Sequence, residues 1–166
     1  MKRLLVCFGG FVLCAILAGC GSDTHDGLVS DTIANIRLAA NEVGNIKTRV
    51  EEAIKRHEDG KKFDLADAIE ATTKLKQAGD QAQEIGRRIA RVRAQITDEE
   101  RKLNVPKHKT SLTAAFGELL KQRDELRAAL VKAESLGQNA KSEVKVLRDK
   151  IVEAESPFEE LSRSTN

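Results

Sequence analysis

Residues 116–161 read FGELLKQRDELRAALVKAESLGQNAKSEVKVLRDKIVEAESPFEEL, the longest regular pattern in the chain. Apolar residues recur there at alternating steps of three and four, the spacing that places side chains along one face of an α-helix. Twelve of the fourteen positions in this apolar stripe are apolar, the exceptions being Arg123 and Gly137. The pattern predicts a long helix with one buried face and therefore an all-helical fold.

The stripe consists of these positions: Phe116, Leu119, Arg123, Leu126, Leu130, Ala133, Gly137, Ala140, Val144, Leu147, Ile151, Ala154, Phe158 and Leu161. Weaker apolar stripes precede it in the chain. Together with the glycine and proline residues that separate the stripes, they predict three helices, covering about residues 28–57, 65–103 and 111–155. Gly60 ends the first helix, and Pro106 ends the second because the residue before a proline avoids helical dihedral angles.

The expected fold is an elongated, antiparallel three-helix bundle or coiled coil, because short connections make neighbouring helices antiparallel. Phe63 and Asp64 are expected to act as the hydrophobic staple and N-cap of the second helix. Folding the chain at Gly60 and near residue 108 brings small residues to one height on all three helices. They are Ala39, Ala40, Gly44, Ala78, Gly79, Ala82, Ala133, Gly137 and Ala140. Such a level predicts close helix packing; the alternative is that the glycines only weaken their helices.

The N-terminal residues have the three parts of a secretory signal: the basic Lys2 and Arg3, an uncharged apolar stretch over residues 4–17, and small residues before Cys20. The apolar stretch is shorter than the roughly 20 residues that cross a bilayer. We therefore expect a signal peptide that is removed.

The four residues Leu17-Ala18-Gly19-Cys20 resemble the lipobox of bacterial lipoproteins. The resemblance implies that a signal peptidase recognises Leu17, Ala18 and Gly19, and that Cys20 becomes an N-terminal residue carrying S-diacylglycerol and N-acyl groups. It also implies a location in the cell envelope. That location is the outer membrane facing the periplasm in a didermal bacterium, and otherwise the outer face of the cell membrane.

The expected organisation has four parts, and Cys20 is the only cysteine that stays after the leader is cut. The parts are a signal peptide (1–19), a lipidated N-terminus and flexible tether (20–27), a helical bundle (28–158) and a frayed tail (159–166). No specific family is apparent for the helical part.

Charge argues against a nucleic-acid partner. Loss of Lys2 and Arg3 with the leader lowers the 28 basic residues to 26, equal to the 26 acidic ones, whereas backbone binding needs excess positive charge. The chain also has no Trp or Tyr, so a base-stacking platform or sugar-binding cleft is not expected. A cluster of four arginines (Arg87, Arg88, Arg91, Arg93) is expected to pair with acids on the other helices (Asp31, Asp124, Glu125).

The sequence carries no recognisable catalytic or metal-binding pattern. Its three histidines are not spaced to share one helix face, and its paired glutamates are adjacent in sequence and so point in different directions. A narrow bundle also leaves little room for a substrate pocket. We therefore expect no enzyme activity, no metal, no small-molecule substrate and no cofactor other than the covalent lipid on Cys20.

Basic residues gather at the predicted turn between the second and third helices: Arg101, Lys102, Lys107 and Lys109. The tether leaves the bundle at the same end, so this basic tip could rest on anionic lipid headgroups. The alternative is an ordinary solvated turn.

The expected function is that of a lipid-anchored cell-envelope protein with a structural or interaction role. Its helices would pack against a protein partner or a second copy. The alternative is a periplasmic binding or chaperone-like accessory subunit of an envelope complex. An uncovered, concave apolar surface would favour the binding role, and a closed bundle would favour the structural one.

Overall fold

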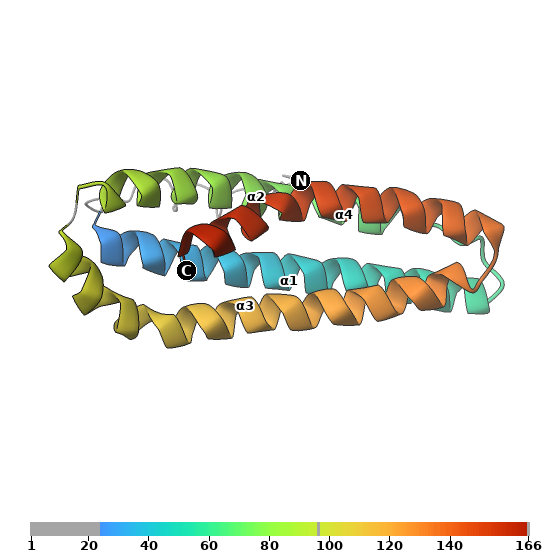
Figure 1. Ribbon diagram of the computed structural model, residues 1–166. Helices are drawn as coiled ribbons and strands as arrows, with labels where there is room; N and C mark the ends of the chain where they lie inside the picture. Colours follow the sequence, from blue (N-terminus) through green and yellow to red (C-terminus); the bar gives the residue numbers. More distant parts are fainter. Residues whose placement is uncertain (1–23, 96, 166) are drawn as a thin grey trace, which may run out of the picture.

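The computed structural model describes residues 24–95 and 97–165, with the backbone alone described for His25, residues 98–107 and residues 163–165. This part of the chain forms four helices: α1 (His25–Glu58), α2 (Ala66–Arg93), α3 (Asp98–Glu134) and α4 (Gln138–Thr165). They run alternately up and down one elongated bundle, without any strand in the described residues (Figure 1). The predicted all-α bundle is confirmed, but it has four helices instead of three.

Gly137 divides the long apolar stripe between two helices. Its φ of +132° is a conformation that L side chains rarely adopt and that glycine tolerates because it lacks a Cβ. The prediction of one continuous helix over 111–155 is therefore wrong: Gly137 ends a helix instead of weakening one. The pattern of burial was correct, because every stripe residue outside this turn is buried except the partly exposed Phe116 and Arg123.

The turn between α2 and α3 lies earlier than predicted. The second helix was expected over 65–103 with a break at Pro106, whereas α3 already begins at Asp98 and continues through Pro106. Residues 97–100 (TDEE) fit a capping box followed by acidic residues, which favours a helix start there. Figure 1 shows α3 bending within its first turns, as expected near a proline that removes one backbone hydrogen bond.

The four helices do not enclose the core equally. α1 packs along both α2 and α3, and α2 packs along α4, whereas α3 and α4 have few contacts with each other. Because the helices alternate in direction, α1 and α3 are parallel neighbours, and so are α2 and α4 (Figure 1). The side of the bundle between α3 and α4 is consequently its least closed side.

The start of α2 is held by side chains from its own turn and from α4. The N-cap is Leu65, one residue after the predicted Asp64. The Asp64 carboxylate still accepts a hydrogen bond from the Ala66 backbone N–H at 2.8 Å, and Phe63 is buried. In addition, the Leu65 N–H donates to the carboxylate of Glu143 in α4 at 2.7 Å. This second cap joins residues far apart in sequence, so local reasoning could not find it.

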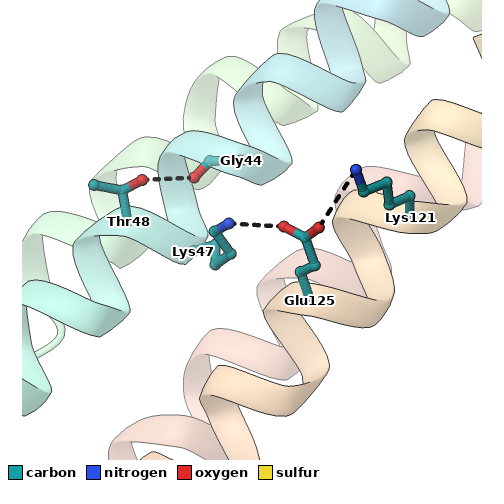
Figure 2. Close-up of polar contacts among 5 residues, drawn as sticks. All are labelled: Gly44, Lys47, Thr48, Lys121 and Glu125. Carbon is teal, nitrogen blue, oxygen red and sulfur yellow. Dashed lines mark hydrogen bonds and ion pairs between the residues drawn. The ribbon is translucent and has the colours of Figure 1, made fainter.

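An ion pair links the parallel helices α1 and α3 (Figure 2). Lys47 Nζ lies 2.7 Å from Glu125 Oε2, and Lys121 Nζ lies 4.0 Å from Glu125 Oε1. The hydrogen bond with Glu125 raises the pKa of Lys47, and the same bond lowers the pKa of Glu125. Both partners are thus held in their charged forms at neutral pH.

Helix α4 approaches the backbone of α2 closely at Gly79. A Cβ atom on Gly79 would lie 2.5 Å from the carbonyl oxygen of Ala154 and 3.4 Å from Cγ of Pro157. Gly79 thus lies at a close helix contact, but its partner Ala154 is not a member of the predicted level of small residues. Gly137 lies in a turn, so its predicted place in that level is wrong.

Pro157 changes the course of α4. Proline has no N–H for the carbonyl of Glu153, and the Ser156 hydroxyl donates a hydrogen bond to that carbonyl at 3.3 Å instead. Beyond Pro157 the helix turns across the bundle (Figure 1) and continues to Thr165, with Leu161 buried. The tail that was expected to fray is helical as far as Thr165, and its one apolar side chain, Leu161, belongs to the same buried stripe. At the other end, α1 begins within the predicted tether, at His25.

Substitution of Gly79 tests this packing. We expect Gly79→Ala to lower the free energy of unfolding by roughly 1–3 kcal/mol, because the obstructing atom belongs to the α4 backbone and cannot rotate away. Gly117→Ala is the matched control in α3: its new Cβ would meet nothing within 4 Å, and it should stabilise the helix by about 0.5–1 kcal/mol. Urea denaturation followed by circular dichroism measures both; equal effects would contradict the packing.

Candidate functional site

The predicted lipidation motif cannot be compared with the structure. Leu17, Ala18, Gly19 and Cys20 lie outside the described residues. The first described helix begins at His25, five residues after Cys20. Lipidation of Cys20 therefore stays a prediction from the sequence.

The predicted basic tip belongs to a helix and not to a turn. Arg101, Lys102 and Lys107 have a helical backbone within α3, and their side chains are outside the described part of the structure, whereas Lys109 is exposed. The neighbouring His108 faces the bundle, with Nε2 3.2 Å from Asp26 Oδ1 at the start of α1. Contact of these basic residues with a membrane stays a prediction.

Two of the four arginines near the end of α2, Arg87 and Arg91, have described partners on their own helix. Arg87 and Arg91 each lie 3.5 Å from a carboxylate oxygen of Glu84, and the predicted partner Glu125 is paired with Lys47 instead. These contacts are long and exposed, so they contribute little to stability. Among the side chains that the structure describes, no cluster of histidine, cysteine or carboxylate groups could hold a metal ion.

A cavity of about 320 Å³ lies on the open side of the bundle, between α3 and α4. The sequence had suggested a bundle too narrow for a pocket, and this cavity arises because α3 and α4 are spaced apart and α4 is kinked at Pro157. Its lining is half from α3 (Phe116, Leu119, Leu120, Arg123) and half from α4 (Glu155, Phe158, Glu159, Ser162). The walls are mainly aromatic and aliphatic, with a few polar groups, as in pockets that bind small molecules.

The polar part of this cavity centres on Glu155. Arg123 Nε lies 3.0 Å from Glu155 Oε2, and Arg123 Nη2 lies 3.9 Å from Glu159 Oε1. The Glu155 side chain is only 8% exposed, against 35% for Arg123 and 60% for Glu159. Glu155 is thus a buried carboxylate held by a cation that still reaches solvent.

Glu155 has a perturbed ionisation. Burial raises its pKa above the ordinary carboxyl value of 4.5, and the nearby Glu159 acts in the same direction. The guanidinium of Arg123, and more weakly that of Arg127, opposes this by favouring the carboxylate. Among the described residues no hydrogen-bond donor reaches Glu155 Oε1, so one buried oxygen is left without a partner. A buried acceptor of this kind is costly unless something donates to it.

The sequence contained one signal for this site. Arg123 interrupts the apolar stripe, and a charged residue at such a position indicates a polar partner. The sequence does not identify that partner, because the turn at Gly137 was not predicted. Glu155 sits next to the stripe position Ala154 and reads as an ordinary exposed glutamate. The reversal of the chain is what brings it opposite Arg123.

The raised pKa of Glu155 predicts a specific dependence of stability on pH. The folded state holds this proton more tightly than the unfolded chain, so burial of Glu155 destabilises the protein progressively as pH rises from about 4.5 through the raised folded pKa. We expect the unfolding free energy of Glu155→Gln, relative to wild type, to increase over this window and then level off. Urea denaturation at a series of pH values measures the difference. Glu160→Gln, on the exposed face of α4, is the control for the loss of a carboxylate; a flat difference for Glu155→Gln would contradict the assignment.

Comparison with known protein families, with curated proteins and with solved structures finds no match to this chain. Among the described residues, no helix is both long enough and apolar enough to cross a membrane. Functional conclusions therefore depend on the N-terminal motif and on the geometry of the α3–α4 side.

Proposed function

We propose that the protein is a lipid-anchored component of the bacterial cell envelope whose helical bundle serves as an interaction module. The observation that carries this proposal is the sequence Leu17-Ala18-Gly19-Cys20, placed after a basic start and an apolar stretch. Support also comes from the short distance in sequence between Cys20 and α1. A diacylglycerol and an N-acyl chain together give a firm anchor, whereas a single chain binds only marginally.

The bundle geometry supports one orientation on the membrane. α1 begins at the end of the bundle where α2 ends and α3 begins (Figure 1), so the anchor is attached at that end. The 34 residues of α1 then extend about 50 Å away from the lipid. Arg87 and Arg91 are exposed toward the anchored end, where basic side chains favour anionic headgroups.

A second function, the binding or accessory-subunit role, is supported by a separate observation. The open side between α3 and α4 contains a cavity with apolar walls and a buried carboxylate, a feature that a purely structural rod does not require. In the proposed orientation Phe116 lies 18 residues into α3, roughly 27 Å from the anchored end, so the cavity would face the aqueous compartment.

The lipid anchor is tested by metabolic labelling. Cells that produce the protein and are supplied with radiolabelled palmitate should incorporate label into the wild type and not into Cys20→Ala, because Cys20 supplies both acylation sites. The leader cysteines provide matched controls: Cys7→Ala and Cys14→Ala should keep the label, since cleavage would remove both residues. Label that persists in Cys20→Ala, or is lost equally in Cys14→Ala, would contradict the proposed anchor.

A further inference from the structure

The cavity between α3 and α4 contains a buried polar side chain in addition to its apolar surface. Glu155 projects from the inner side of α4 and is more than nine-tenths buried, while Phe116, Leu120 and Phe158 contribute apolar walls. Leu120 is 54% exposed and makes the mouth of the cavity apolar. A ligand would therefore meet apolar contacts first and a carboxylate at depth.

The unpartnered oxygen of Glu155 specifies the chemistry of a ligand head group. Oε2 is occupied by Arg123, and Oε1 has no donor among the described residues. The lining holds two carboxylates, from Glu155 and Glu159, and one guanidinium, from Arg123. A ligand should therefore donate a hydrogen bond to Oε1 and carry a positive charge that balances the second carboxylate. A cationic donor does both. An anionic head group would meet an acceptor that it cannot satisfy.

A comparison with Asn35 separates this site from an ordinary buried polar group. Asn35 Oδ1 is also buried and without a described partner, but Asn35 lies in the packed core and its Nδ2 bonds Gln81 Oε1 at 3.4 Å. It lines none of the described cavity. Of the two residues, only Glu155 belongs to the lining of the cavity.

We propose that the α3–α4 cavity binds a small amphiphilic amine, with the ammonium group on Glu155 Oε1 and a short alkyl or aryl group among Phe116, Leu120 and Phe158. This inference rests on the binding role proposed above and is independent of the lipid anchor. The volume of about 320 Å³ is at the small end of the range for ligand pockets, which suits a ligand of this size.

The test is calorimetric titration of the full chain carrying Cys20→Ala with three probes of equal chain length: hexylammonium, hexanol and hexanoate. They share one apolar group and differ only in the head group. At neutral pH we expect hexylammonium to bind about tenfold more tightly than hexanol, since a hydrogen bond to a charged group contributes about that factor. Hexanoate should bind most weakly. This comparison needs no substitution within the cavity, so it is valid even if a cavity variant fails to fold.

Variants then locate the binding site. Glu155→Gln should remove the preference for hexylammonium over hexanol, whereas the matched change Glu160→Gln on the exposed face of α4 should retain it. Leu120→Trp should weaken all three probes by filling the mouth of the cavity. Val131→Trp is its control, because Val131 is equally exposed on α3 but does not line the cavity.

The outcomes separate this inference from the functions proposed above. Equal binding of hexylammonium and hexanol, sensitive to Leu120→Trp, would overturn the amine assignment and retain a binding role for the cavity. An amine preference that survives Glu155→Gln would overturn it as well. Binding of no probe would overturn both the amine assignment and the binding role, and palmitate labelling of Cys20 would be unaffected by any of these results.

Discussion

The reversal of the chain at Gly137 is the constraint on which the rest of the structure depends. If residues 116–161 formed a single helix, that helix would be longer than any other helix of the chain, and part of its apolar stripe would have no helix to pack against. The positive φ at Gly137 folds it into two segments, so that α3 covers α1 and α4 covers α2. Each segment then buries its part of the stripe against a helix of comparable length, and the hydrophobic effect acts along the full length of the bundle.

The same reversal creates the candidate site. α3 and α4 are joined by a short turn, yet each packs mainly on a different helix, so they separate along their length and leave one side of the bundle open. Close packing of Gly79 on the α4 backbone and the change of direction at Pro157 then place Phe158 and Glu155 opposite Phe116 and Arg123. Helix packing thus places the Glu155 carboxylate in a buried position, and its burial lowers the stability of the fold. Buried ionisable groups with perturbed pKa values are concentrated at functional sites.

The sequence predicted burial better than it predicted connectivity. Apolar spacing identifies which residues enter the core. The same helix face is buried whether the stripe forms one continuous helix or two helices joined by a turn. Gly137 could not be interpreted in the same way, since a glycine within a heptad pattern can either weaken a helix or end it, and only the tertiary partners decide. Pro106 gave the opposite error, because α3 is started by residues 97–100 and continues past the proline with a bend instead of ending there. Glu155 and Glu143 could not be assigned at all, since each acts on a residue from another helix.

The distance between labels on α3 and α4 tests the central claim most directly. Spin labels at Glu118→Cys and Glu160→Cys, with the three native cysteines replaced by alanine, occupy exposed positions on the two helices. Double electron–electron resonance should give a distance far shorter than the length of a continuous helix, because the turn at Gly137 brings both positions back alongside one bundle. In a continuous helix these positions, 42 residues apart in the sequence, would be separated by about 63 Å. A distribution centred near that longer distance would contradict the reversal at Gly137, and with it the α3–α4 site.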